Sequence, residues 1–428
     1  YRIHKCSSAC LSNRAVSSYK GENPLKIPIL FHFQRRHAKA DCLSKSLDVH
    51  YKAPCGRSLR SFQDVQSYLF ETKCDFLFID HFSFNTYVLL GRNTVNPEPL
   101  VFDLDISNGA ESVPISFCND IDRARLPYFK YRRASWPRGY YLNNLSSTFL
   151  DSCDCTDGCI DRSKCACLQL TARGCRKVSV SPNAKMSRGY SYKRLEGPVP
   201  SGIYECSVSC RCDKMMCQNR VVQHGIQVRL QVFNTEKKGW GVRCLDDIDK
   251  GTFVCTYSDL VEVGQTEPAE MDSAECRRKS LSLKGVACGR SDVLNDKYVV
   301  KPSTKVLQKA DCVEEAHRQA KQGIFCVEAD GDRTLLKNAN NENIYILDAT
   351  KEGNVGRFLN HSCCPNLFAQ SVFVETHNRS FPWVAFFTNR HVRAGTELTW
   401  DYGYEAGSMP ETEISCWCGV QKCRKKTL

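Results

Sequence analysis

Residues 357–366 read Arg-Phe-Leu-Asn-His-Ser-Cys-Cys-Pro-Asn. Asn360 and His361 place an amide beside an imidazole, and both groups hydrogen-bond strongly. Read alone, such a pair more often closes a turn than binds a ligand. The neighbouring Cys363 offers a thiolate, which is a good zinc ligand. The stretch therefore combines hydrogen-bonding groups with a potential metal ligand.

The C-terminal segment supplies the other ligands of this metal site. Cys416, Cys418 and Cys423 with Cys363 make four thiolates, a complete tetrahedral set for zinc. Cys364 is a rival for the place of Cys363. A zinc ion held this way would join the C-terminal tail to the 357–366 stretch.

A second concentration of cysteine precedes this region. The chain has 27 cysteines, and ten of them lie in residues 153–217. One-residue gaps favour shared metal ligation over disulfides, because close neighbours cannot easily reach separate partners. Nine thiolates hold three tetrahedral zincs only if three of them bridge, so we expect about four zincs in all, with Cys175 left over. The nine predicted ligands are Cys153, Cys155, Cys159, Cys165, Cys167, Cys206, Cys210, Cys212 and Cys217.

The rest of the C-terminal half has the alternation of half-buried β-strands. It runs over residues 221–260 and resumes from 344 to 399, around a polar insertion at about 259–342 that we expect to be largely irregular. Within residues 221–260, the glycines of Gly239-Trp240-Gly241 would let the backbone approach a ligand, and the Trp240 ring would offer a flat apolar wall beside it.

These segments together resemble the histone H3 lysine-9 methyltransferases of the bifurcated SET class. The nine cysteines are similar to the pre-SET motif, residues 357–366 to the most diagnostic SET segment, and Cys416-Trp417-Cys418 with Cys423 to the post-SET pattern. Residues 397–402, Glu-Leu-Thr-Trp-Asp-Tyr, resemble the catalytic tyrosine motif. The resemblance covers 153–428 apart from the insertion, whose place is typical of the bifurcated class. The chain looks most like the second member of that class.

The resemblance implies methyl transfer from S-adenosylmethionine to lysine 9 of the histone H3 tail. Trp400 matches an aromatic switch of product specificity, and its lack of a phenolic hydroxyl favours di- or trimethylation. The implied outcome is transcriptional repression and heterochromatin. The implied catalytic residues are Tyr402, Tyr257 and Tyr345. The implied cofactor-binding residues are Lys238, Gly239, Trp240, Arg357, Asn360, His361 and Trp417.

Two departures leave a second interpretation open. Ser258 and Asp259 follow Tyr257 where the family commonly has a residue and then glycine, and a cofactor tyrosine is hard to locate in 263–342. The alternative is a catalytically weak chromatin adapter that binds DNA and protein partners. A purely zinc-dependent DNA-binding protein would leave the SET motifs unexplained.

The N-terminal region is basic. Residues 1–60 hold 12 Lys and Arg against 3 Asp and Glu, which favours a polyanionic partner. Residues 51–61 resemble a methyl-CpG-binding domain in which Arg60 would read guanine, and Ser61 is placed to cap a helix. Arg35 and Arg36 are poor matches for the second reading arginine. Recognition of methylated DNA and contact that ignores methylation both stay open.

The sequence thus predicts an α+β multidomain protein, nuclear and chromatin-associated, with chromatin corepressors as partners. No run of 18 apolar residues is present, so no membrane span is expected. The predicted units are a polar segment 1–19, a small α/β methyl-CpG-binding-like domain 20–95, a β-rich connection 96–150, pre-SET 151–220, SET 221–406 and post-SET 407–428.

Overall fold

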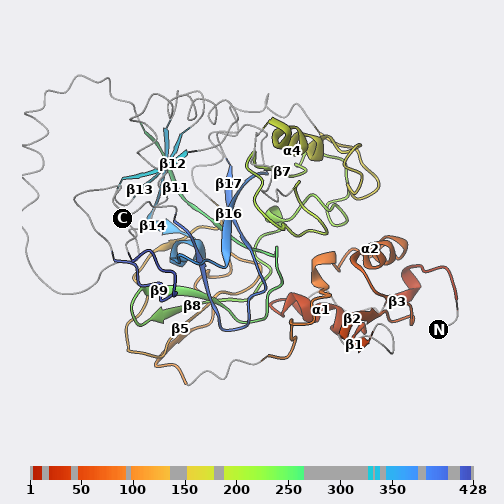
Figure 1. The fold of residues 1–428 in the computed structure, drawn as a ribbon, viewed down its shortest axis with the longest axis horizontal. Helices are drawn as coiled ribbons and strands as arrows, with labels where there is room; N and C mark the ends of the chain where they lie inside the picture. Colours follow the sequence, from red (N-terminus) through yellow and green to blue (C-terminus); the bar gives the residue numbers. More distant parts are fainter. Residues whose placement is uncertain are drawn as a thin grey trace, which may run out of the picture.

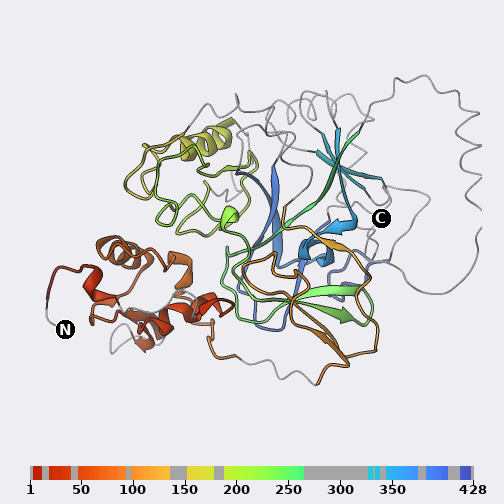
Figure 2. The same ribbon diagram turned by 180° about the vertical axis from the view of Figure 1, so that it is seen from behind.

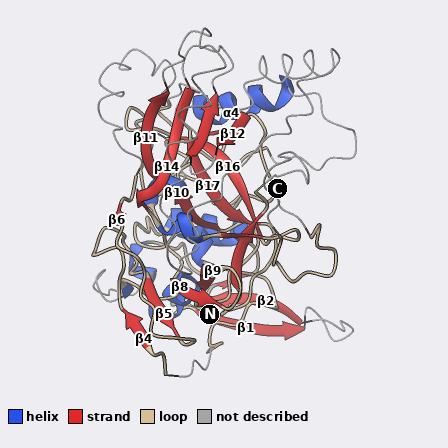
Figure 3. Ribbon diagram, turned by 90° about the vertical axis from the view of Figure 1, so that its left-hand side faces the viewer, coloured by secondary structure: helices blue, strands red, loops and turns tan. Residues whose placement is uncertain are grey.

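A computed structural model describes residues 3–11, 19–39, 47–92, 98–134, 152–177, 188–264, 326–330, 333–337, 344–374, 382–402 and 415–425. A small N-terminal α/β unit and a cysteine-rich unit lie beside a larger β-rich unit (Figure 1). Strands dominate the larger unit (Figure 3). In the described part, no helix is both long and apolar enough to cross a membrane.

The N-terminal unit packs α2 (Phe62–Glu71) beside a three-stranded antiparallel sheet. Ser61 accepts a hydrogen bond from the Asp64 amide at 3.1 Å, so the predicted helix cap is confirmed. Edge-to-face aromatic contacts, including Phe33 on Tyr68 at 5.7 Å, fill the core. The other elements are η1 (Ser8–Cys10), η3 (Pro24–Lys26), α1 (Ile27–Leu30), β1 (Gln34–Lys39), β2 (Leu47–Lys52), β3 (Ser58–Leu59) and η4 (Ile79–His81).

The largest sheet brings distant segments together in the order β15-β18-β9-β8-β5-β4. The antiparallel pair β8 and β9 lies at its centre, and β15 joins β18 in parallel. Alternating apolar side chains of these strands face one buried cluster. The strands are β4 (Val101–Asp103), β5 (Ser116–Asn119), β8 (Leu230–Thr235), β9 (Gly239–Cys244), β15 (Asn360–His361) and β18 (Glu397–Trp400).

Two further sheets complete the β-rich unit. One has the order β10-β17-β16-β7, with β10 (Phe253–Tyr257), β17 (Trp383–Thr388), β16 (Leu367–Phe373) and β7 (Ile203–Tyr204). The other runs β11-β14-β13-β12, and β6 (Lys130–Tyr131) pairs with β14 (Ile344–Gly353). The short helix η6 (Val222–His224) contacts β10, and η9 (Val355–Phe358) contacts both β10 and β14.

The expectation of an irregular insertion is wrong at its two ends. The strands β11 (Asp259–Gly264), β12 (Cys326–Asp330) and β13 (Arg333–Lys337) all lie within it and add to β14. Their backbone groups find partners in the sheet built on β14, a pairing that local polarity does not reveal. The insertion's residues 265–325, 331–332 and 338–342 lie outside the described part of the chain.

The cysteine-rich unit carries α4 (Ala166–Lys177) and adjoins the β7–β16 edge of the second sheet (Figure 2). The N-terminal unit is fastened to the β-rich unit by buried carboxylates. Asp249 accepts hydrogen bonds from Ser83 at 2.6 Å and Asn85 at 3.0 Å, and Asp247 accepts one from Arg92 at 2.9 Å. Buried charge-assisted bonds of this kind hold the units in one arrangement.

Candidate active site and zinc centres

The 357–366 stretch lies beside the 397–402 segment and is hydrogen-bonded to it through the side chain of Asn366. Asn366 donates from Nδ2 to the carbonyl of Glu397 at 2.7 Å, and its Oδ1 accepts from the amide of Thr399 at 2.8 Å. The amide thus replaces a strand partner of β18. Asn360 and His361 lie opposite Thr399 and Trp400 in the parallel ladder. The 357–366 and 397–402 motifs, which are separated in the sequence, therefore lie side by side in one sheet.

Glu397 connects three predicted cofactor-binding residues, a role that its place in the tyrosine motif did not reveal. Its carboxylate contacts Lys238 Nζ at 2.5 Å and accepts from Asn360 Nδ2 at 2.9 Å. The same Nδ2 donates to the carbonyl of Trp240 at 3.1 Å. The Asn360 amide thereby fixes the Gly-Trp-Gly backbone, and any contact it makes with a cofactor stays a prediction.

Gly241 makes this close approach possible. A Cβ at that position would lie 3.0 Å from Glu397 Oε1 and 3.1 Å from Asn360 Nδ2. Gly239, at the start of β9, has φ +69°, a conformation that favours glycine. Trp240 is half-buried and packs edge-to-face on Phe117 at 5.2 Å. This narrow backbone cradle with an aromatic wall is compatible with a bound S-adenosylmethionine.

His361 holds the backbone at Tyr402, the predicted catalytic tyrosine, in place. Its Nδ1 accepts from the amide of Tyr402 at 3.2 Å, and its Nε2 lies 3.4 Å from Cys363 Sγ. Burial lowers the pKa of His361 to about 4, so the ring is neutral at physiological pH. A neutral ring that accepts at Nδ1 carries its proton on Nε2, facing the sulfur of Cys363.

Tyr402 and Trp400 form one buried aromatic group. The Tyr402 hydroxyl donates to the carbonyl of Leu359 at 2.8 Å. The Trp400 ring lies 5.1 Å from Tyr402 and packs edge-to-face on Phe386 at 5.0 Å. Such centroid distances are ordinary for aromatic pairs, so the indole is accommodated without crowding.

The other predicted site residues lie around this group. Tyr257 ends β10, is half-buried and packs on the same core. Tyr345 lies in β14 opposite Val263, and its side chain is outside the described part. Arg357 places its guanidinium 4.8 Å from the centre of the Phe129 ring, a cation–π contact.

The post-SET thiols converge as predicted. Cys363, Cys416, Cys418 and Cys423 have sulfur atoms within 4.8 Å of one another, a geometry compatible with one zinc. Burial raises the pKa of Cys418, but backbone hydrogen bonds around Cys363 and Val420 outweigh it and lower the value to about 6. Asp401 ties this tail to the site, because it contacts Arg424 at 2.6 Å and His361 at 3.6 Å. Trp417 is 60% exposed beside the cluster.

The nine pre-SET thiols lie in one cluster, buried except for the half-buried Cys155. Seven of them belong to four-thiol groups that are compatible with zinc, whereas Cys210 and Cys217 belong to none of these groups. Cys206 Sγ lies 3.7 Å from Cys153 and Cys159 and 3.9 Å from Cys165. Two zinc–sulfur bonds of about 2.3 Å in a tetrahedron place their sulfurs about 3.8 Å apart. Overlapping four-thiol groups share Cys153, Cys159, Cys165 and Cys206, as bridging ligands would. Among the described cysteines, Cys175 joins none of these groups.

Arg220 supports this cluster, a role that the sequence did not reveal. It is 1% exposed and donates to the Ser207 carbonyl at 2.7 Å and to Cys212 Sγ at 3.5 Å. Hydrogen bonds between the thiols lower the pKa of Cys165, Cys210 and Cys212 and raise the pKa of Cys159, Cys167 and Cys206. The guanidinium of Arg220 further favours the ionised form of Cys212.

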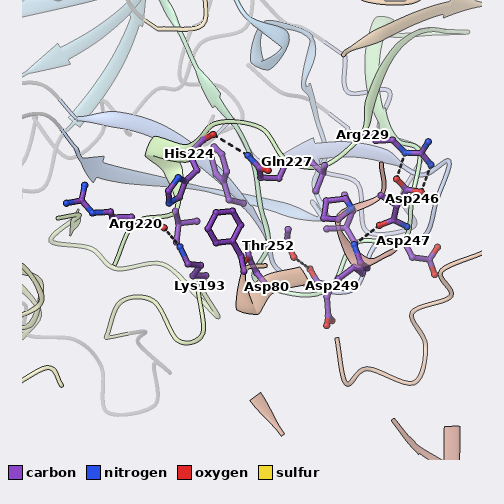
Figure 4. A pocket seen from close by; sticks show the side chains of 18 residues that line it. Asp80, Lys193, Arg220, His224, Gln227, Arg229, Asp246, Asp247, Asp249 and Thr252 are labelled. Carbon is purple, nitrogen blue, oxygen red and sulfur yellow. Dashed lines mark hydrogen bonds and ion pairs between the residues drawn. The ribbon is translucent and has the colours of Figure 1, made fainter. Parts of the chain in front are cut away.

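A pocket at the junction of the three units is a separate feature (Figure 4). None of the predicted site residues lines it. Two of its cationic side chains have partners inside the protein. Lys193 donates to the Arg220 carbonyl at 2.8 Å, and Arg229 contacts Asp246 at 2.6 Å. The pocket therefore marks a joint between units and lies apart from the candidate active site.

Three family models match successive parts of the chain. The Methyl-CpG binding domain model matches residues 19–92, the Pre-SET motif model 107–220 and the SET domain model 239–403. With the paired strands β15 and β18 and the cysteine clusters, these matches define the chain as a SET-domain protein that also carries a methyl-CpG-binding domain and a pre-SET motif.

The relatives narrow this class. Histone-lysine N-methyltransferase SETDB2 of Homo sapiens is 43% identical, in an alignment that covers 100% of this chain and 80% of the relative. The chain therefore belongs to the family of SETDB2-type histone-lysine N-methyltransferases, and the resemblance and the β-rich fold class are confirmed. Histone-lysine N-methyltransferase eggless of Drosophila melanogaster is 36% identical over 100% of this chain and 37% of the relative. The crystal structure of Arabidopsis thaliana SUVH6 in complex with SAM is 27% identical, covers 76% of this chain and 56% of that chain, and has a TM-score of 0.48.

Proposed function

We propose that this protein transfers methyl groups from S-adenosylmethionine to lysine 9 of histone H3 and adds two or three of them. It would act in the nucleus on chromatin, with corepressor partners, and support transcriptional repression and heterochromatin. The observation that carries the proposal is the parallel pairing of β15 with β18, which in turn pairs with β9. It gathers Trp240, Asn360, His361, Trp400 and Tyr402 at one place.

The chemistry sets what these residues must do. S-adenosylmethionine supplies an electrophilic methyl on a sulfonium, and the lysine amine must be neutral to accept it. A free lysine has a pKa of about 10.4, so a dry channel has to favour its deprotonated form. The aromatic rings of Tyr257, Trp400 and Tyr402 would wall such a channel. The Tyr402 backbone amide donates to His361 and its hydroxyl donates to the Leu359 carbonyl, so the hydroxyl is held in one place and its lone pairs can align the amine.

The environment of Ser258 favours the enzyme over the adapter. Ser258 is buried, its amide donates to Asn354 Oδ1 at 3.2 Å, and its hydroxyl donates to the Arg133 carbonyl at 3.1 Å. Ser258, the first residue of this departure, therefore serves a specific set of hydrogen bonds at the end of β10 and leaves Tyr257 in its strand, while the backbone of Asp259 begins β11 opposite Gly353.

Radiolabel transfer to recombinant histone H3 tests the proposed substrate. We expect label on wild-type H3 and none on H3 in which lysine 9 is replaced by arginine, because only the side chain of lysine 9 would enter the channel. H3 in which lysine 4 is replaced by arginine is the matched control and should be labelled like the wild type. Equal labelling of the histone that lacks lysine 9 would contradict the choice of lysine, and no label on any of the three would favour the adapter.

The degree of methylation should depend on Trp400. A tyrosine hydroxyl can hold a water in the space that a methylated amine needs, whereas the indole N–H donates and cannot accept. We expect the wild type to form di- and trimethyl-lysine and Trp400→Tyr to shift the product towards monomethyl-lysine. Mass spectrometry of an H3 peptide under excess cofactor measures this shift. Trp383→Tyr, on β17, is the matched control, and a wild-type enzyme that stops at one methyl would contradict the proposal.

The N-terminal unit would contact DNA without selecting for methylation. Arg35 donates to the carbonyls of Ser83, Asn85 and Val88 at 2.7–3.1 Å. Its guanidinium therefore binds the protein's own backbone instead of facing a DNA base. Arg60 is exposed, and its backbone amide donates to Asp64 at 2.8 Å. Arg36 is exposed as well and contacts Gln34, so the basic unit offers exposed guanidinium groups for contact that does not depend on methyl groups.

Binding of duplex DNA by the full chain measures this. We expect equal affinity for methylated and unmethylated duplexes and a steep loss with salt. Arg60→Ala should weaken binding by about 1–3 kcal/mol if its fork reads guanine. The exposed Arg173 on α4 is the matched control as Arg173→Ala. A clear preference for methylated DNA would contradict this expectation.

A further inference from the structure

The N-terminal unit contains a cluster of ligand atoms away from both SET-associated centres. Nε2 of His4 and Sγ of Cys6, Cys10 and Cys55 all lie within 4.8 Å of one another. The His4 nitrogen lies 3.2 Å from the Cys10 sulfur and 3.8 Å from the Cys6 sulfur. Bonds of about 2.0 Å to nitrogen and 2.3 Å to sulfur place neighbouring tetrahedral ligands about 3.5–3.8 Å apart. The four atoms are therefore close to the spacing of a zinc site.

Two separate segments build this cluster. His4, Cys6 and Cys10 come from residues 3–11, where η1 turns the chain so that the Cys10 amide bonds to the Ser7 carbonyl at 2.9 Å. Cys55 comes from the turn after β2, where the Gly56 amide bonds to the Ala53 carbonyl at 2.8 Å. Because the two segments lie far apart in the sequence, the fold brings Cys55 to the other three ligands, and closeness along the chain does not explain the cluster.

Two polar side chains lie at the sulfurs of this cluster. Arg57 points a guanidinium nitrogen at Cys6 Sγ at 3.6 Å while it contacts Glu71 at 2.6 Å. The buried Tyr68 donates to the Cys10 carbonyl at 3.0 Å, and its hydroxyl lies 3.8 Å from Cys55 Sγ. Three thiolates around Zn²⁺ leave one negative charge, which the neighbouring Arg57 offsets.

We propose that His4, Cys6, Cys10 and Cys55 bind a structural Zn²⁺ ion. A three-thiolate, one-imidazole set is a closed tetrahedral site that selects zinc over harder cations. The ion would fasten residues 3–11 to the β2–β3 turn. Within residues 3–11, Cys6 is 4% exposed and packs in the aromatic core of the unit. A domain of this size has a small core, and a metal ion is a common means of stabilising it. The same turn leads directly to Arg60, so the ion also holds the base of the exposed arginine.

Zinc content of the full chain, purified without chelator, tests this site. We expect His4→Ala combined with Cys10→Ser to hold one zinc fewer per chain than the wild type by elemental analysis. His4→Cys should keep the wild-type content, since a fourth thiolate replaces the imidazole. Cys175→Ser is the matched control and should also keep it. Equal zinc in the double variant and the wild type would overturn the site.

Alkylation of the wild-type chain gives a second measurement that needs no folded variant. The half-buried Cys10 and Cys55 should resist alkylation until a chelator is added, while the exposed Cys364 reacts from the start. Peptide mapping by mass spectrometry follows each thiol. Reaction of Cys10 and Cys55 at the rate of Cys364 before chelation, or a disulfide among Cys6, Cys10 and Cys55, would overturn the proposal.

Discussion

Replacing Cys206 with serine should release zinc from the pre-SET cluster and unfold the cysteine-rich unit. Its sulfur lies within 3.9 Å of the sulfurs of Cys153, Cys159 and Cys165, so one substitution removes a shared ligand. Structural zinc in small domains has an apparent binding free energy of ~10–16 kcal/mol. A typical domain is stable by only ~5–15 kcal/mol, so losing even one ion is enough to unfold it.

Elemental analysis and thermal unfolding of the full chain measure this effect. We expect up to three zincs fewer than in the wild type and loss of the cooperative transition of the unit. Cys175→Ser is the matched control, because its sulfur lies 3.8 Å from Ser201 Oγ and belongs to none of the described metal-ligand groups. A Cys206→Ser chain with wild-type zinc content and melting would show that the thiols hold no bridged cluster.

Replacing Tyr402 with phenylalanine should reduce methyl transfer by about 10²-fold or more while the chain stays folded. The substitution keeps the ring beside Trp400 and His361 and removes one hydroxyl, which bonds to the Leu359 carbonyl at 2.8 Å. One such hydrogen bond contributes only about 0.5–1.5 kcal/mol to stability. Misalignment of the attacking amine, in contrast, has a cost on the order of 10²-fold in rate.

The control for this prediction is another buried tyrosine. Tyr190 is 6% exposed and donates to Glu205 at 2.8 Å, beside the cysteine-rich unit. Tyr190→Phe therefore loses the same hydroxyl and a bond to a buried carboxylate, which typically contributes more to stability than a bond to a carbonyl, and it should keep most of the activity. Single-turnover rates on an H3 peptide, with calorimetric binding of S-adenosylmethionine, separate chemistry from cofactor affinity. Equal rates for Tyr402→Phe and Tyr190→Phe would remove Tyr402 from the chemistry.

The sequence by itself was sufficient for the class of protein and for much of the metal chemistry. Close spacing of thiols limits them to shared metal ligation, so the nine pre-SET cysteines could be grouped without coordinates. The Ser61 cap and the strand alternation are likewise local patterns, and the structure shows both. Cys363 joins the C-terminal thiols in the structure, as the family pattern implied.

Only the tertiary structure decided the features that depend on contacts between distant residues. Glu397 serves Lys238 and Asn360 because β18 lies between β9 and β15. The guanidinium of Arg35 donates its hydrogen bonds to backbone carbonyls about fifty residues further along the chain. Cys55 reaches His4, Cys6 and Cys10 only after the sheet folds back, and β12 and β13 exist because β14 offers the sheet an edge to extend. Hydrogen bonds and metal ligands are satisfied by whatever the fold brings near, and local composition does not encode that proximity.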